Sequence, residues 1–539
     1  SPARPARRRG AARDLQTTYS PGRGAIDQPM DATTSADLEA QYTSRRPLIE
    51  PRESVSIRGA AAGTRAAPAS RLQRLFAPVD VASLACFRIA FGALMVADVF
   101  RYWSTIEETF IRPTFHFTYY GFDWVRPWPG DGMYVHFAVM GVAAAFVSLG
   151  LFYRAAASVF FLAFSYMFLI EQARYLNHFY LIALVSFLMI FVPAHRAWSL
   201  DAWLRPRLRA QTVPAWALWL VRAQIAIPYV YGGIAKLNAD WLHGEPLRAW
   251  LAKRGGRPVI GPLLQHEWAP YLFSYGGLVF DLLVVPFLLW RRSRPYAFVA
   301  TLAFNLINGV VFTIGIFPWV MAAATLMFFP PDWPRRLAAW ARAHVLASPA
   351  GLPEPVHNPA PEPPPVRLGP AHYTTVGLLG AYMAFQLLFP LRHWLYPGDV
   401  AWTEEGHKFA WRMKLRDKQG TVRFFATDPD SGRTWEVPHR RHLRGWQRRQ
   451  LTDKPEMLVQ FAHFLADELR AQGFPRIEIR AQSSLSLNGR KPAPLVDPNV
   501  DLAAQPRSIW PAPYILPLTS PPVWATPAEP AEPVEEDAR

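Results

Sequence analysis

One lysine stands directly after an apolar segment, in surroundings that suit a reactive amine. Lys236 follows the apolar run 214–235, and Gly232 and Gly233 lie one turn before it. Two glycines at this place allow close approach by a neighbouring backbone or a flat ligand. Burial disfavours the charged form of an amine, and a neutral amine is a general base. The alternative is a lysine that reaches the lipid headgroups while its stem stays in the apolar layer.

A second polar pair stands at the start of another apolar segment. Asn177 and His178 are adjacent where the run 176–193 begins. An imidazole placed there is able to stabilise an oxyanion by donating a hydrogen bond. The commoner role of a lone histidine at such a boundary is packing with its hydrogen bonds satisfied, so both interpretations stay open.

Four further ionisable residues interrupt apolar segments: Arg88, Asp98, Arg222 and Asp281. Charged groups inside a membrane are costly and usually face an interior. Arg88 and Asp98 are ten residues apart, too far to pair along one helix, so each needs another partner. We interpret all four as structural contacts between helices.

The composition shows what must hold these residues. The chain has 539 residues, of which 51% are hydrophobic and only 18% charged, against about 25% charged in soluble domains. The formal net charge of +16, from 57 Lys and Arg against 41 Asp and Glu, therefore does not indicate a nucleic-acid binder. The single cysteine, Cys86, excludes an intrachain disulfide and cysteine-ligated metal centres.

The apolar residues fall into segments long enough to cross a bilayer, for which about 20 residues suffice. These segments are 81–100, 133–152, 155–171, 176–193, 214–235, 269–290, 296–313, 315–330 and 372–391. The predicted fold class is an α-helical multi-span membrane protein with about nine transmembrane helices and a small C-terminal α+β extramembrane domain. Gly315 and Pro318 mark a break, so 296–330 forms either two spans or a re-entrant hairpin.

Arginines in the connections decide the predicted orientation. With nine spans, the connections that carry Arg154, Arg196–Arg209, Arg291–Arg294 and Arg335–Arg342 all lie on one side, which the positive-inside rule assigns to the cytoplasm. We therefore expect a multi-pass protein of the cell (inner) membrane, with a cytoplasmic N-terminus and the C-terminal domain on the outer, periplasmic side. Eight spans would instead put that domain inside.

Four regions are expected along the chain. They are a disordered basic arm (1–74), a membrane domain (75–393), an extramembrane α+β domain (394–519) and a disordered acidic tail (520–539). In the third region, strands are predicted in TVRFFATD (421–428) and RIEIRAQSSLSLNG (476–489). An amphipathic helix is predicted over 455–471, with one apolar face formed by Leu458, Phe461, Phe464, Leu465 and Leu469.

An ordered series of short motifs carries a family resemblance. NHFYL (177–181), YVYGGIAKLNADWLHG (229–244), FTIGIFPWVM (312–321) and FAWRMKLR (409–416) occur in the order found in the vitamin K-dependent γ-glutamyl carboxylase family. The chain resembles a bacterial-type homologue with an HTTM-type membrane domain. The resemblance implies an enzyme that uses vitamin K hydroquinone (reduced menaquinone or phylloquinone), O2 and CO2. Such an enzyme converts glutamate of a peptide or protein acceptor into γ-carboxyglutamate and releases vitamin K epoxide.

The resemblance also implies roles for single residues. Lys236 is the base that acts on the hydroquinone, and His178 takes part in the oxygenation. The remaining positions line the sites for the quinone (Asn177, Phe317 and Met321) and for glutamate (Trp411 and Met413). No metal is implied, and the ligand-like spacing of His439 and His442 falls in an arginine-rich, solvated loop.

The chain departs from the animal enzymes at Ala235, where they carry a second lysine, and it has a shorter region after the soluble domain. Recognition of a propeptide is therefore not expected to carry over. The partners implied are the acceptor and the lipid bilayer, with no nucleic acid. Three alternatives remain open: an epoxidase without carboxylation, a non-catalytic quinone-binding membrane protein, and a transporter or lipid-handling protein.

Overall fold

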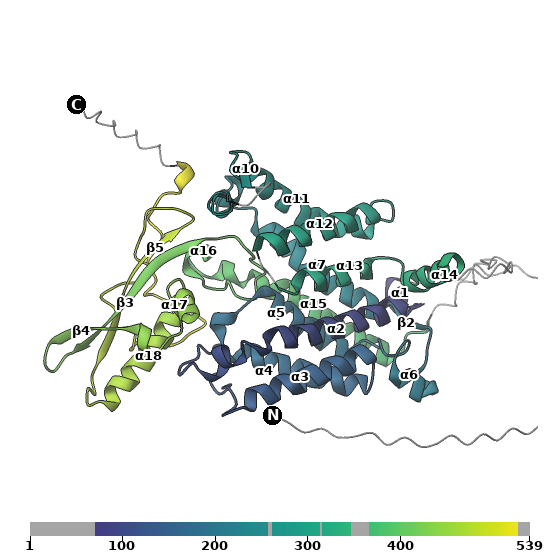
Figure 1. The fold of residues 1–539 in the computed structure, drawn as a ribbon, viewed down its shortest axis with the longest axis horizontal. Helices are drawn as coiled ribbons and strands as arrows, with labels where there is room; N and C mark the ends of the chain where they lie inside the picture. The colour runs from purple at the N-terminus through teal and green to yellow at the C-terminus, as the bar shows by residue number, and fades with distance from the viewer. Residues whose placement is uncertain (1–69, 257–260, 313–314, 346–365, 526–539) are drawn as a thin grey trace, which may run out of the picture. The chain divides into compact units, whose positions relative to one another are not determined.

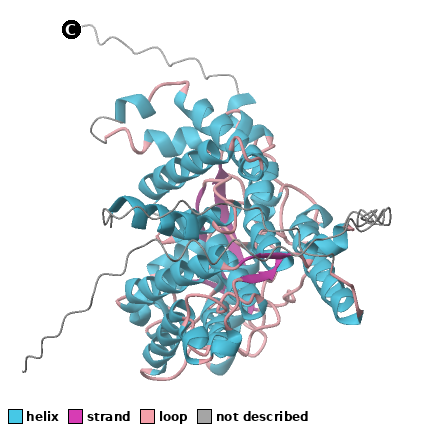
Figure 2. Ribbon diagram, turned by 90° about the vertical axis from the view of Figure 1, so that its right-hand side faces the viewer, coloured by secondary structure: helices cyan, strands magenta, loops and turns pink. Residues whose placement is uncertain are grey.

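The structure is a computed structural model that describes residues 70–256, 261–312, 315–345 and 366–525. The predicted basic arm up to residue 69 and the predicted acidic tail from residue 526 lie outside the described residues. What is described consists mainly of helices, with strands confined to two small sheets (Figure 2).

Each predicted apolar segment overlaps a helix in the described part of the chain (Figure 1). These helices are α2 (Ala82–Trp103), α3 (Gly132–Leu149), α4 (Tyr153–Ile170), α5 (Asn177–Phe191), α7 (Ala215–Ala235), α11 (Ala269–Leu289), α12 (Arg294–Phe312), α13 (Phe317–Thr325) and α15 (Pro370–Leu388). The predicted break falls between α12 and α13, where Gly315 has a φ of +62° and Pro318 occupies the first turn of α13.

Five helices within the described residues are long and apolar enough to cross a bilayer. They are α2, α3, α4, α11, and α15 together with its 3₁₀ extension η5 (Phe389–Leu395). The apolar helix α5 has 15 residues, which at 1.5 Å per residue span roughly 22 Å of a hydrocarbon core of about 30 Å. A multi-span helical membrane protein is thus confirmed, whereas the number of nine spans stays a prediction.

Two arginines connect the membrane helices to neighbouring elements. The guanidinium of Arg88 on α2 donates to the carbonyls of Val147 (2.8 Å) and Ala194 (3.2 Å). Arg222 on α7 donates to the carbonyls of Met327 (2.7 Å) and Phe329 (2.9 Å). Both therefore make structural contacts between elements, as predicted.

Asp98 forms a different contact from the one expected. Its carboxylate accepts from Arg101, three residues further along the same helix α2, at 2.6 Å. We expected a contact with another helix, but a spacing of three residues already brings two side chains together on one helix face.

The C-terminal part contains a three-stranded antiparallel sheet in the order β4 (Arg433–Val437), β3 (Lys418–Asp428), β5 (Glu478–Leu487). Helix α18 (Pro455–Ala471) packs against β5 and buries Leu458, Phe461 and Leu465. The predicted strands and helix are confirmed here. The sheet covers the apolar face of the helix, which would otherwise be exposed to water. Strand β4 was not predicted. A second, two-stranded sheet pairs β1 (Pro78–Asp80) with β2 (Thr212–Pro214).

Candidate functional site

Lys236 is buried at the end of α7. Its side-chain amine donates hydrogen bonds to Asp281 Oδ2 on α11 and, at 3.4 Å, to the carbonyl of Gly232. The amine also lies 5.3 Å from the centroid of the Trp241 ring. Lys236 is 6% exposed and Asp281 4%. The alternative of a lysine that reaches the headgroups is therefore wrong, and Asp281 makes a structural contact between helices, as predicted.

Two glycines let α7 approach α11 closely beside this pair. A Cβ atom at Gly232 would lie 3.1 Å from Asp281 Oδ2, and one at Gly233 would lie 2.7 Å from the Leu282 side chain and 3.1 Å from its backbone nitrogen. On α11, Gly277 stands beside Lys236 Cε, with 3.8 Å to a Cβ placed there. The close approach predicted for Gly232 and Gly233 is thus made by α11.

The segment 409–414, which joins the membrane helices to the sheet, has an unusual backbone. Phe409, Trp411 and Lys414 have φ angles of +61°, +57° and +54°. Side chains other than glycine seldom adopt this left-handed conformation, which costs on the order of 1–3 kcal/mol for each residue. Such strain persists only where surrounding contacts over-determine it, and it gathers at functional sites.

This segment contacts the membrane helices close to the residues that the sequence predicted. The Phe409 N–H donates to the Tyr175 hydroxyl at 2.6 Å, and that hydroxyl donates to Asn177 Oδ1 at 2.9 Å. The Trp411 ring lies 4.9 Å from the ring of Tyr180 on α5. Met413 Cε would lie 3.5 Å from a Cβ atom at Gly232, so Met413 reaches the glycine next to the Lys236–Asp281 pair.

His178 and Phe317 form a separate contact between α5 and α13. Their ring centroids are 5.4 Å apart. Met321 follows Phe317 by one turn of α13 and is 2% exposed. Met413 therefore reaches Gly232 beside Lys236, and Tyr175 links Asn177 to Phe409. His178, Phe317 and Met321 lie apart from these contacts, on α5 and α13.

Sequence reasoning missed a group of buried polar side chains around Tyr180. Gln386 on α15 lies beside the Tyr180 hydroxyl, and Gln224 Oε1 accepts from the Tyr382 hydroxyl at 2.6 Å. Both side-chain amide atoms of Gln386, the Gln224 Nε2 atom and the Trp411 Nε1 atom have no hydrogen-bond partner among the described residues. These three side chains are 0–1% exposed. Buried polar atoms without partners are rare and call for an occupant, either water or a ligand.

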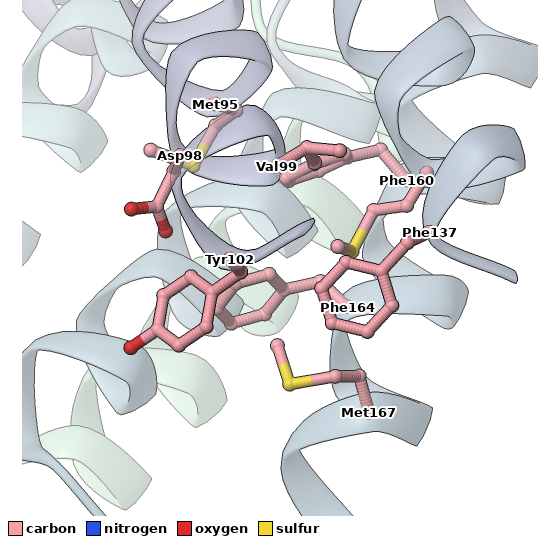
Figure 3. A pocket seen from close by; sticks show the side chains of 9 residues that line it. Met95, Asp98, Val99, Tyr102, Phe137, Phe160, Phe164 and Met167 are labelled. Carbon is pink, nitrogen blue, oxygen red and sulfur yellow. The ribbon is translucent and has the colours of Figure 1, made fainter. Parts of the chain in front are cut away.

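A small cavity lies elsewhere, between α2, α3 and α4 (Figure 3). Phe137, Phe160 and Phe164 line it, and the Asp98 carboxylate stands at its edge. Its volume of about 10 Å³ is enough for roughly one water molecule. It does not accommodate a quinone ring.

A larger cleft of about 230 Å³ adjoins the chain that follows Lys236. Asn238 and Asp240 line it, together with Arg412 and Arg490 from the C-terminal part. Asp240 accepts from Arg490 at 2.7 and 2.8 Å and from Asn488 at 2.7 Å. Burial opposes ionisation of Asp240, but these hydrogen bonds lower the pKa of its carboxyl below the usual value. The end of α7 is thereby bound to the sheet domain.

Two family models match the chain. The HTTM domain matches residues 76–333, and the lumenal domain of vitamin K-dependent gamma-carboxylase matches residues 371–521. No solved structure matches the chain.

Proposed function

Because the chain belongs to the vitamin K-dependent γ-carboxylase family, we propose that it couples epoxidation of vitamin K hydroquinone to the carboxylation of glutamate side chains. It is a membrane protein of that family. The coupling, the residues that perform it and the acceptor are the proposal. The N-terminus is proposed to face the cytoplasm and the C-terminal domain the periplasm.

The buried pair of Lys236 and Asp281 is the observation that carries the proposal. Two opposite charges in a dry site lose their hydration, and that cost approaches or exceeds the Coulombic gain. Asp281 Oδ2 lies within hydrogen-bond distance of the amine, so it is placed to exchange a proton with Lys236 during the reaction. Lys236 is then a general base at the end of a membrane helix, where a lipid-borne substrate arrives.

Buried polar groups among the membrane helices suit a hydroquinone. When bound, vitamin K hydroquinone supplies the reducing electrons for O2 and a base strong enough for the γ-proton of glutamate. Its hydroxyl groups are donors and acceptors, and so is an amide, so the unpartnered Gln386 amide, the Gln224 Nε2 atom and the Trp411 N–H fit them. Asn177, Phe317 and Met321 are proposed to complete the quinone site.

His178 is proposed to act next to the quinone by donating a hydrogen bond to developing negative charge. Its ring is held against Phe317, which limits its rotation. The apolar surroundings exclude water, which would quench a strong base and a carbanion.

Glutamate is proposed to arrive from water through the cleft beside Asn238. Trp411 and Met413 stand between that cleft and the helices, because Arg412, between them in the chain, lines the cleft while Met413 reaches Gly232. The segment 409–414 thus has one residue facing each side, as expected for a wall between the acceptor and the lipid-borne substrate.

The test is epoxidation by the purified full chain in detergent. Vitamin K hydroquinone is supplied under oxygen, and epoxide is measured by chromatography with and without a glutamate-containing peptide. Incorporation of labelled bicarbonate into that peptide measures carboxylation. Epoxide together with label supports the coupled enzyme, and epoxide alone restricts the protein to epoxidation. Quinone binding without epoxide contradicts the proposal and favours a non-catalytic quinone-binding protein.

A further inference from the structure

Five large apolar side chains, from three segments of the chain, are exposed. Ile509 and Trp510 are 55% and 74% exposed. Trp394 and Leu395, at the end of η5, are 67% and 80% exposed, and Trp124, in the connection before α3, is 70% exposed. We call these five residues the aromatic edge. Contiguous exposed apolar groups mark an interaction site.

Hydrogen bonds bring the three segments of the aromatic edge together. The Tyr396 hydroxyl, next to Leu395 in the chain, donates to the carbonyl of Ile509 at 2.5 Å. Arg507 donates to the carbonyl of Thr118 at 2.9 Å and also bonds to Asp123, the neighbour of Trp124. These hydrogen bonds bring together segments that are about 110 and 390 residues apart in sequence.

Part of the aromatic edge lies at the end of a membrane span. Residues Pro370–Leu395 form a helix long and apolar enough to cross a bilayer, and only 11% of its apolar window is buried inside the protein. Apart from the face that packs on α7, most of this helix is therefore open to lipid, and Trp394 and Leu395 lie at its end. Tryptophan is enriched at this boundary, since its ring is apolar and its N–H is polar.

We propose that the loop around Ile509 and Trp510 of the C-terminal domain docks into the headgroup region of the adjoining bilayer surface. The partner is lipid, because Tyr396 holds the loop at Ile509 beside the end of the lipid-exposed helix Pro370–Leu395. Attraction comes from the aromatic and aliphatic side chains, as the nearby Arg507 is already paired with Asp123 and Glu456. The docking gives the domain a second hold on the membrane besides its covalent link through η5. It does not depend on the proposed function.

The test uses the full chain reconstituted into phosphatidylcholine vesicles. In a Cys86→Ser background, Pro511→Cys places an environment-sensitive fluorophore beside Trp510. Ala471→Cys, at the exposed end of α18 in the same domain, is the matched control. Quenching is measured with nitroxide lipids labelled near the headgroup and, separately, with iodide in the water.

The label at 511 is expected to be quenched several-fold more strongly by the lipid nitroxide than the label at 471, and less by iodide. Adding Ile509→Ser and Trp510→Ser should reverse this pattern at 511 and leave 471 unchanged. Strong iodide quenching at 511 in the parent chain overturns the proposal. Protection from both quenchers overturns it as well, since it points to a second copy of the chain. Lipid quenching that survives the double substitution shows that these side chains do not dock.

Discussion

The amine of Lys236 at the end of α7 and the carboxylate of Asp281 on α11 form a buried pair across 45 positions of sequence. Gly232, one turn before the lysine, leaves room for that carboxylate, and Gly277, one turn before the aspartate, lies beside the lysine stem at ordinary contact distance. Each helix therefore supplies one ionisable partner. The close approach at Gly232 helps to fix the geometry of the pair.

Replacing Lys236 with alanine removes the proposed base. Epoxidation by Lys236→Ala is expected to fall by about 10²–10⁴-fold, the usual contribution of a positioned general base. Lys253→Ala is the matched control, because that side chain is 59% exposed and pairs only at 3.4 Å with Asp417. The measurement is epoxide formation at saturating hydroquinone. Normal turnover in Lys236→Ala would remove this residue from the mechanism.

The pair also gives a stability prediction that is independent of turnover. Lys236→Met or Asp281→Leu alone leaves a buried group without its partner, which costs about 3–5 kcal/mol. The double variant replaces the pair by apolar groups and is expected to regain most of that loss while remaining inactive. Unfolding of the four proteins in detergent, with epoxidation measured in parallel, checks both parts. Strictly additive losses would mean that the two side chains do not interact.

We expect the Gln386 side chain to lower the stability of the protein and to favour binding of the hydroquinone. Its amide has no partner among the residues described, and such a group costs roughly 1–3 kcal/mol. Gln386→Leu should therefore raise the unfolding temperature without quinone and reduce the additional rise that hydroquinone produces. Gln472→Leu, at an exposed position after α18, serves as control. An unchanged hydroquinone-induced rise would exclude Gln386 from the quinone site.

Acid should weaken the C-terminal domain through Glu404. Burial opposes its ionisation, but Arg416 at 2.5 Å and Lys418 at 2.8 Å hold the pKa of this carboxyl well below its usual value of 4.5. Because the folded-state pKa is depressed, this contribution to stability is fully present above pH 4.5 and is lost as the pH falls toward the folded value.

The corresponding variant is Glu404→Gln. It is expected to unfold at a lower temperature than the parent at pH 7 and to lose less stability between pH 5 and acid. Glu436→Gln is the control, since Glu436 is 49% exposed and lies 3.9 Å from Arg423. Thermal unfolding across this pH range is the measurement. Parallel curves for the parent and Glu404→Gln would contradict the assignment.

The spacing of apolar residues along the chain predicted the helix α18 and the membrane helices. The helix expected over 455–471 is α18 with the same bounds, and its predicted apolar face is buried except for Phe464, which is partly buried. The membrane helices followed from runs of apolar residues. Both are properties of neighbouring residues, because side chains 3.6 positions apart share a helix face and apolar length alone decides whether a segment suits lipid.

By itself, the sequence determined a helical membrane protein, its C-terminal α+β part and Lys236 as a candidate base. Only the tertiary structure decided that Asp281 faces this lysine, that Tyr175 links Asn177 to Phe409, and that Gln224 and Gln386 lie buried without complete partners. The contacts Lys236–Asp281 and Tyr175–Phe409 join residues 45 and 234 positions apart. They depend on how helices pack and on where glycines let them approach, and periodicity along one helix carries no information about either.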